Sequence, residues 1–261
     1  MTKPAPGPDQ PPIPVRLVTF NTRHGVGTDD ALDLPRLAKV LQSLDADVIC
    51  LQEVDRHFGD RSDDVDQALL LSRALDMQLA WGPAIEGDGE EHGYGNALLS
   101  RLPILVSDVH PLPGGGEPRS ALRTMVELDG GALWVTTTHL TRRAGDRAAQ
   151  IAAVAALHTE PMETGVVTGD FNTAPDAPEL AALREGFTDA WELARDRADR
   201  AGWRFWRHDD GGTHPAVSPH RRIDQVWVSE GVAVASAQVA DGHGASDHLP
   251  LVVDLEVRGG V

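Results

Sequence analysis

The sequence predicts a single α/β domain, and three observations support this prediction. Short apolar runs rich in β-branched residues, which are typical of strands, recur along the chain. Segments with apolar residues at helical spacing lie between these runs. No internal repeat, long linker or low-complexity block divides the sequence after its proline-rich start. A chain of 261 residues that is 41% hydrophobic can bury a substantial core.

The first half of the chain predicts a tail followed by alternating strands and helices. The proline density of residues 1–14 favours an extended, flexible tail, so we expect one domain over residues 15–261. The runs VRLVTF and VICL have the composition of strands, and the leucines between them recur at helical spacing. The predicted elements are strands at 15–20, 48–51 and 96–100 and helices at 32–44 and 66–74.

The second half alternates in the same way but includes one irregular stretch. The predicted elements are strands at 105–110, 124–128, 133–138, 166–169, 225–228 and 249–256 and helices at 146–158 and 179–184. The stretch 201–220 is rich in glycine, histidine and tryptophan. Its ring side chains, which either contact a substrate or cover the end of the domain, are Trp203, Phe205, Trp206, His208 and His214.

Charge and cysteine content limit the classes of partner and site. The net charge of −17 opposes non-specific attraction to DNA, so a nucleic acid is a possible partner but not the favoured one. No apolar run approaches the roughly 18–20 residues that span a bilayer, so we expect no stable membrane insertion. The single cysteine, Cys50, excludes an intramolecular disulfide and a cysteine-based zinc cluster. We therefore expect a cytoplasmic, monomeric protein.

Polar side chains recur at the ends of the apolar strands. Such positions hold a side chain rigidly yet leave it at the mouth of a sheet, where it can act on a ligand. A single strand-end Asn or Asp is more often a turn residue, but this chain repeats the arrangement many times. The residues are Asn21, Glu53, Asn96, His139, Asp170, Asn172, Asp224, Asp247 and His248.

This set of side chains favours metal-assisted hydrolysis. No G-x-S-x-G elbow is present, and Cys50 lies within a predicted strand, so covalent acyl chemistry is disfavoured. The oxygen ligands Glu53, Asp247 and the Asn21 amide suit Mg²⁺, with Mn²⁺ as a substitute. Hydrolysis of a phosphate ester is a natural reaction for such a set.

Seven ordered segments strengthen this interpretation. They are TFNTRHG (19–25), LQEVD (51–55), YGNALLSR (94–101), TTHL (137–140), TGDFN (168–172), RRIDQVWVS (221–229) and SDHLPLVV (246–253). In order and spacing the series resembles the motifs of the endonuclease/exonuclease/phosphatase superfamily, in the form found in bacterial metal-dependent hydrolases. The resemblance implies a four-layer, DNase I-like α/β/β/α sandwich, in which two mixed sheets pack face to face with helices outside.

The resemblance also implies a metal centre and a group that prepares the attacking water. Glu53 is implied as the main ligand of Mg²⁺, with Asn21 and Asp247 near the same ion directly or through water. Asp170 would align and activate the attacking water, and Asn172 would hold that water or a phosphoryl oxygen.

Three further residues are implied to act on the phosphate. His248 would contact the scissile phosphate, oriented by a hydrogen bond to Asp224. His139 would stabilise charge on the phosphate or on the leaving oxygen. The proton acceptor in this scheme is either Asp170 or His248.

Four residues form the predicted substrate-binding set. Arg119 and Arg123 are candidate clamps for a phosphate or carboxylate, with a surface position as the alternative for each. His24 lies in a loop expected near the phosphate, and Asn96 opens a predicted strand. Abasic endonucleases carry an acidic residue at the position of Arg23, which weakens the resemblance to those nucleases.

The leading hypothesis is an enzyme, a Mg²⁺-dependent phosphoester hydrolase that acts on a small or lipid-linked phosphate by in-line attack of water. A DNase I-like or abasic-site nuclease is the alternative within the same fold. A non-catalytic binding module is the alternative from another class, although every expected catalytic position is filled.

Overall fold

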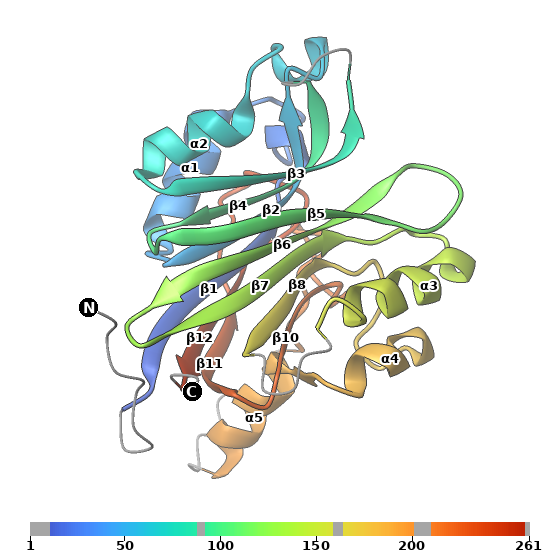
Figure 1. Ribbon diagram of the computed structural model, residues 1–261. Helices are drawn as coiled ribbons and strands as arrows, with labels where there is room; N and C mark the ends of the chain where they lie inside the picture. The colour runs from blue at the N-terminus through green and yellow to red at the C-terminus, as the bar shows by residue number, and fades with distance from the viewer. Residues whose placement is uncertain (1–10, 88–91, 159–163, 201–209, 259–261) are drawn as a thin grey trace.

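The computed structural model describes residues 11–87, 92–158, 164–200 and 210–258 and confirms the predicted α/β sandwich (Figure 1). Strand β1 begins at Ile13, so two residues assigned to the tail belong to a sheet. Pro14 is tolerated because β2 pairs with β1 only from Leu17 onward, which leaves one side of the strand open at the proline. The rest of the predicted tail, residues 1–10, lies outside the described residues.

Twelve strands form two six-stranded sheets in the described part of the chain. The first has the order β11-β12-β1-β2-β4-β3. It is built from β1 (Ile13–Asn21), β2 (Val48–Arg56), β3 (Gln78–Glu86), β4 (Gly93–Ser100), β11 (Val232–Val239) and β12 (Leu251–Val257). Strands β1 and β2 are parallel, whereas β12 runs antiparallel to β1 and β4 antiparallel to β2.

The second sheet has the order β5-β6-β7-β8-β10-β9 and repeats this pattern. It is built from β5 (Ile104–Leu112), β6 (Arg119–Leu128), β7 (Gly131–His139), β8 (Gly165–Asp170), β9 (Thr188–Asp189) and β10 (Asp224–Val228). Its central strands β7 and β8 are parallel, with antiparallel partners on both sides.

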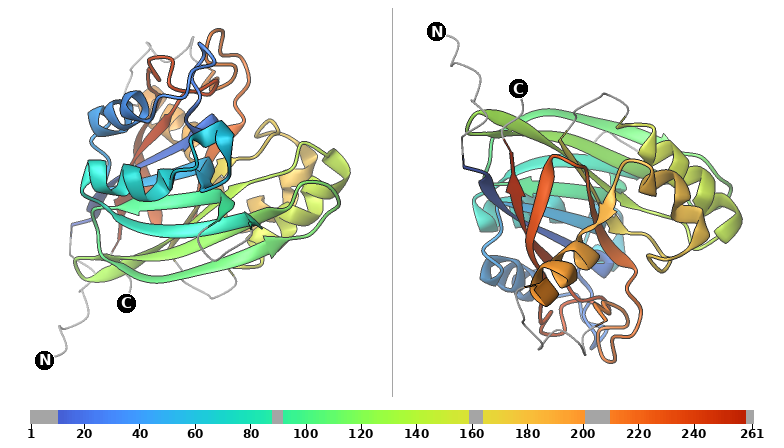
Figure 2. Two further views of the ribbon diagram at one scale, coloured as in Figure 1. Left: turned by 90° about the horizontal axis from the view of Figure 1, so that it is seen from above. Right: turned by 90° about the horizontal axis from the view of Figure 1, so that it is seen from below.

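Helices cover the outer face of each sheet, which completes four layers (Figure 2). Helices α1 (Leu34–Ser43) and α2 (Gln67–Leu75) cover the first sheet, and α3 (Ala144–Ala155) and α4 (Ala181–Arg184) cover the second. Helix α5 (Ala190–Arg200) packs against β10 and β11. Single 3₁₀ turns lie at η1 (Arg23–Gly25), η2 (Asp60–Ser62) and η3 (Pro178–Leu180).

Three apolar clusters lie between the four layers. The cluster between the sheets includes Leu17, Cys50, Leu98, Leu122 and Val135, so Cys50 is buried as predicted. A second cluster lies under α1 and α2, and a third lies under α3 and α4. Side chains therefore alternate along the central strands between the inter-sheet core and a helix-covered face.

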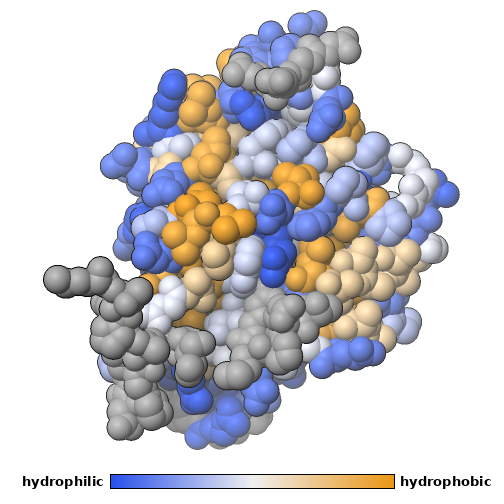
Figure 3. All heavy atoms as spheres, viewed as in Figure 1, coloured by the Kyte–Doolittle hydropathy of each residue, from blue (hydrophilic) through white to orange (hydrophobic). Residues whose placement is uncertain are grey.

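The molecular surface is mixed in polarity. Figure 3 shows apolar patches interspersed with hydrophilic ones on the face viewed in Figure 1. Large exposed hydrophobic side chains on the edge strand β5 are Leu105, Val106 and Val109. Among the helices in the described ranges, none is long and apolar enough to cross a membrane.

Candidate active site

The carboxyl ends of the two parallel strand pairs lie at one end of the sandwich. In β1, Leu17 faces the inter-sheet core, and Asn21, the last residue of the strand, faces the same side because every second residue does. In β7 and β8, His139 and Asp170 end the corresponding inward rows and are paired with each other in the sheet register. The antiparallel strand β10 brings its first residue, Asp224, opposite Asp170. Residues far apart in the sequence thus meet at one edge.

A bulge in β2 places Glu53 at this edge. The register between β2 and β4 shifts between Leu51 and Val54, and Glu53 has a φ of 56°. Because of the extra residue, neither the Gln52 nor the Glu53 side chain points to the helix-covered face. Gln52 donates a 3.0 Å hydrogen bond to Thr137 Oγ1 of the opposite sheet. Glu53 accepts one from Asn21 Nδ2, also at 3.0 Å.

Asn21 joins the two carboxylates of the site. Its Nδ2 donates to Glu53 Oε1 at 3.0 Å and to Asp170 Oδ2 at 3.1 Å. Its Oδ1 accepts from the Arg23 backbone N–H, so the nitrogen faces the carboxylates in this orientation. Ser246 Oγ donates to the Asn21 carbonyl, which ties the segment before β12 to the end of β1.

Asp170 is fully buried and held from several sides. The backbone N–H of Asn172 donates to its Oδ1 at 2.8 Å. Burial, followed by the charge of Asp224, raises the pKa of Asp170 to about 7, although His248 and hydrogen bonds from Asn172 and Asn21 oppose this shift. Asp170 can therefore exchange a proton near neutral pH.

His248 forms a buried pair with Asp224. Its Nδ1 lies 2.8 Å from Asp224 Oδ2, and its Nε2 lies 3.9 Å from Asp170 Oδ2. Burial alone would lower the pKa of His248, but Asp224, Asp170 and Asp247 together raise it to about 9. His248 is thus an imidazolium at neutral pH, and Nε2 is the nitrogen that faces the centre of the site.

His139 is also buried, but its neighbours differ from those of His248. Its Nε2 lies 3.1 Å from Asn172 Nδ2 and 3.4 Å from Asp170 Oδ2, and its Nδ1 lies 3.0 Å from Arg119 Nη1. Donors thus face both ring nitrogens. Burial, then Arg119 and His248, lower the pKa of His139 well below its ordinary value. His139 is therefore neutral where His248 is charged.

A narrow recess opens beside these groups. It is lined by Glu53, Ala84, Tyr94, Gly95, Asn96, Arg119, Ser120 and His139. Asn96 donates to the Ser120 carbonyl and presents a buried Oδ1 that has no hydrogen-bond partner among the described residues. Arg119 forms an ion pair with Glu117 beside the recess. Two of the predicted substrate-binding residues, Asn96 and Arg119, thus lie at the site.

The other two predicted substrate-binding residues are placed differently. His24 is half-buried in η1. Burial and then the charge of Arg61 lower its pKa, whereas the charge of Glu53 opposes this shift. Arg123 lies apart from the cluster. It follows Ala121 on the helix-covered face of β6, and its guanidinium lies 3.5 Å from the centre of the Trp134 ring. Arg123 lies four residues beyond Arg119 along β6, opposite Thr136, so it lies away from the end of the sandwich that holds the site.

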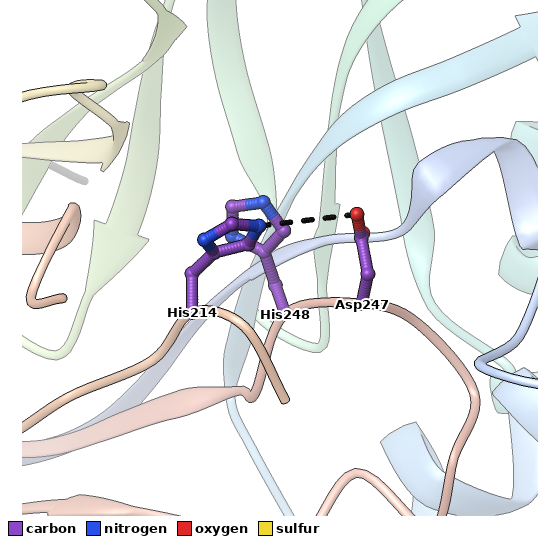
Figure 4. Close-up of side chains that lie close together, drawn as sticks. All are labelled: His214, Asp247 and His248. Carbon is purple, nitrogen blue, oxygen red and sulfur yellow. Dashed lines mark ion pairs between the residues drawn. The ribbon is translucent and has the colours of Figure 1, made fainter. Parts of the chain in front are cut away.

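The described residues also reveal a neighbour that the strand-end pattern did not select. The His214 ring lies against the His248 ring, with centroids 4.6 Å apart, and its Nε2 lies 4.0 Å from Asp247 Oδ2 (Figure 4). His214 lies in an irregular segment, where periodicity carries no information about facing. The other ring residues noted in that stretch, Trp203, Phe205, Trp206 and His208, lie outside the described residues.

The donor set at this edge fits a hard divalent cation. Two carboxylates, from Glu53 and Asp170, converge on one Asn21 amide nitrogen, and Asp247 lies on the neighbouring segment. Carboxylate and amide oxygens are the ligands that Mg²⁺ prefers; the two carboxylates already converge here, whereas the Asn21 amide must turn its oxygen toward them to act as a ligand. Within the described part of the chain, imidazole and carboxylate atoms that all lie within 4.8 Å of one another form two groups, His214–Asp247–His248 and Asp170–Asp224–His248.

The sequence and the fold of this chain are similar to those of known proteins. The uncharacterized protein YbhP of Escherichia coli K12 is 28% identical over 260 residues, covering 93% of this chain and 96% of that protein. A crystal structure of an endonuclease/exonuclease/phosphatase from Beutenbergia cavernae is 26% identical, with a TM-score of 0.75, covering 94% of this chain and 72% of that one. A mannosyl-6-phosphatase of Bacteroides thetaiotaomicron shares the fold at 20% identity, with a TM-score of 0.73, covering 92% and 99% of the two chains.

The family match covers the whole candidate site. Residues 18–248 match the endonuclease/exonuclease/phosphatase family, a range that begins in β1 and ends on His248. It includes both parallel strand pairs and the segments that supply every predicted site residue. The chain therefore belongs to the endonuclease/exonuclease/phosphatase family.

Proposed function

We propose that this protein is a Mg²⁺-dependent phosphoester hydrolase. One observation carries the proposal: the buried Asp170 is joined through Asn21 to Glu53 on one side and approaches the His248–Asp224 pair on the other. A group that can exchange a proton thus lies between oxygen ligands for a cation and a positively charged imidazole. Metal-assisted hydrolysis of a phosphate ester uses groups of these kinds.

Glu53, with Asn21 and Asp247, would hold the metal. Bound there, Mg²⁺, or Mn²⁺ as its substitute, would supply positive charge that neutralises the phosphoryl oxygens. Glu53 suits this task because its carboxylate is less buried than that of Asp170 and lines the recess.

The side chains of the protein would divide the remaining tasks. Asp170 accepts the proton of the attacking water, because His248 already carries a proton shared with Asp224. Asn172 orients the water or a phosphoryl oxygen, and the His248 Nε2–H donates to the phosphate. His139 accepts a hydrogen bond from Arg119 in its neutral form, and together the two residues would stabilise the developing charge on the leaving side.

A small or lipid-linked phosphate is the proposed substrate class. The net charge of −17 disfavours a long polyanion. The shared fold of the mannosyl-6-phosphatase is compatible with a compact phosphate ester. A cytoplasmic location and a monomeric state stay predictions from the sequence.

Hydrolysis assays with Mg²⁺, Mn²⁺ or EDTA test the proposal. The substrates are a nitrophenyl phosphodiester, the matching monoester, inositol phosphates, sphingomyelin and supercoiled plasmid. We expect metal-dependent hydrolysis of a small ester and a loss of at least about 100-fold in kcat for Asp170→Asn. Asp108→Asn, an exposed carboxylate on β5, is the matched control and should retain full activity. Preferential plasmid nicking would favour the nuclease, and no hydrolysis of any substrate would favour the binding module.

A further inference from the structure

A buried polar layer lies directly beneath the candidate site. In β1, β7 and β8, the residue two positions before the site residue is a fully buried threonine: Thr19, Thr137 and Thr168. Earlier in the same strands, Leu17, Val135 and Val166 face the inter-sheet core, and every second residue of a strand faces the same side. The three threonines therefore lie between that apolar core and the site.

The side chain of Gln52 joins this layer across the two sheets. Gln52 is fully buried, and its Nε2 lies 3.1 Å from Thr19 Oγ1 in the first sheet and 3.0 Å from Thr137 Oγ1 in the second. The same nitrogen lies 3.2 Å from the Cys50 carbonyl of its own strand. An amide nitrogen carries two N–H groups, so one can serve Thr137 while the other serves the first sheet. Gln52 is thus a hydrogen-bonded link between the sheets, just below the site.

The backbone of Gln52 is held at the point where β2 bulges. Its carbonyl accepts from the Thr22 backbone N–H at 3.0 Å and from Thr22 Oγ1 at 2.9 Å. Glu53 follows directly and has the positive φ of the bulge. Because the Gln52 side chain and carbonyl are both bonded, the link fixes where the Glu53 backbone lies.

This link connects the two halves of the site. The first sheet carries Asn21 and Glu53, here called the cation side, and the second carries His139 and Asp170, here called the proton side. Thr137, which receives the bond from the first sheet, precedes His139 by two residues. Hydrolysis needs groups from both sides at the same phosphate, and a misplacement of about 1 Å can cost about 100-fold in rate.

Packing alone does not require a polar link at this level. A buried hydrogen bond adds little net stability, and replacing both partners by apolar groups of the same shape is nearly neutral. Apolar side chains hold the two sheets together one row further from the site. A hydrogen bond differs from such contacts in its direction and length, so it fixes the spacing of the groups that it joins.

We propose that Gln52 is a positioning residue, which sets the spacing between the cation side and the proton side through its bond to Thr137. Gln52 lies beneath the site and acts through the residues above it, without touching the substrate itself. The effect on rate rests on the proposed hydrolase function, whereas the effect on spacing does not.

Steady-state kinetics separate the hydroxyl of Thr137 from its packing. In Thr137→Val, which keeps the shape but lacks the hydroxyl, and in Gln52→Met, we expect kcat to fall at least about tenfold while KM stays within about threefold. Thr137→Ser keeps the hydroxyl but loses a methyl group, so it should be less stable yet retain its kcat. Thr124→Val is the matched control, because Thr124 is a fully buried threonine of β6 whose Oγ1 has no partner among the described residues. It should retain full activity.

The double variant Gln52→Met/Thr137→Val should be no slower than the slower single variant, because both changes remove the same bond. Additive losses, full activity in Thr137→Val, or equal losses in Thr137→Val and Thr137→Ser would each overturn the positioning role, as would an equally slow Thr124→Val. Circular dichroism checks the fold of each variant, and the threonine variants carry the test alone if Gln52→Met is unstable.

A second measurement does not depend on turnover. The Asn21 side-chain amide donates to both Glu53 and Asp170, so its NMR signals in ¹⁵N-labelled protein without added metal report the spacing of the two sides. We expect these signals to shift in Thr137→Val and to keep their wild-type positions in Thr124→Val. Unshifted signals in Thr137→Val would overturn the positioning role. A wild type that hydrolyses no ester, together with shifted signals in Thr137→Val, would contradict the proposed function and leave the positioning role supported.

Discussion

Asp170 lies between two kinds of partner. The Asn21 amide and the Asn172 backbone N–H stabilise its charged form, whereas burial and the Asp224 carboxylate favour its neutral form. The opposition brings its pKa to about 7, close to the pH at which a general base works best. His139 and His248, within 4 Å of the same carboxylate oxygen, are driven to opposite charge states by their other neighbours.

His158 supplies a pH prediction at the residue scale. Burial and then Arg123 lower its pKa to about 4, and its Nε2 lies 2.9 Å from Thr136 Oγ1. The unfolded chain binds this proton more tightly, so stability is complete above about pH 6.5 and falls as the pH drops toward 4. Between pH 7 and pH 5 we expect this histidine to cost about 1–2 kcal/mol of unfolding free energy. Urea unfolding of the wild type and His158→Gln at both pH values measures the difference. An identical pH dependence of the two proteins would contradict it.

At the scale of single elements, helix α1 depends on its first residue. Asp33 caps the helix by accepting a 2.9 Å hydrogen bond from the Arg36 backbone N–H. Asp33→Ala should lower the unfolding free energy by about 1 kcal/mol, because one helix-start donor loses its partner. Asp33→Asn retains the acceptor and should cost much less. Urea midpoints at constant m-value test the difference, and equal losses in the two variants would show that the cap is not responsible.

Elements also show what sequence patterns can and cannot predict. Strand composition located β1, β7 and β8, and the polar residue at the end of each strand lies at the site, because parallel strands end at one edge. Composition missed β3, which contains Gly82 and Pro83 but forms a sheet edge where proline is tolerated. It also missed β11, whose alanines and serine resemble a loop, and the highly charged helix α5.

The facing of individual side chains was harder to predict than the strands themselves. Arg123 carries the same charge as Arg119, but it lies four residues further along β6, away from the site, where its guanidinium packs on Trp134. Glu53 reaches the site only through a bulge, which depends on pairing with β4. His214 lies in a segment held by backbone bonds to residues 247–249, and such tertiary contacts leave no local periodicity.

At the scale of the whole molecule, a bound cation should stabilise the fold. If Glu53, Asn21 and Asp247 hold Mg²⁺ only in the folded state, ten times Kd of Mg²⁺ adds about 1.4 kcal/mol. For a domain of this size we expect a rise in Tm of about 3–6 °C. Glu53→Gln should abolish the rise, whereas Glu127→Gln, at an exposed position on β6, should retain it. Thermal melts with and without EDTA test this, and an equal rise in both variants would place the metal elsewhere.

The pairing of β1 with β12 has a consequence for synthesis. The two strands come from opposite ends of the chain, and Ser246 Oγ donates to the Asn21 carbonyl across 225 positions. A ribosome that has released everything up to β10 has exposed Asn21, Glu53, His139 and Asp170 but not His248. Nascent chains at that stage lack both the charged imidazole and the strand that flanks β1, so the proposed hydrolysis would begin only after His248 and β12 have emerged.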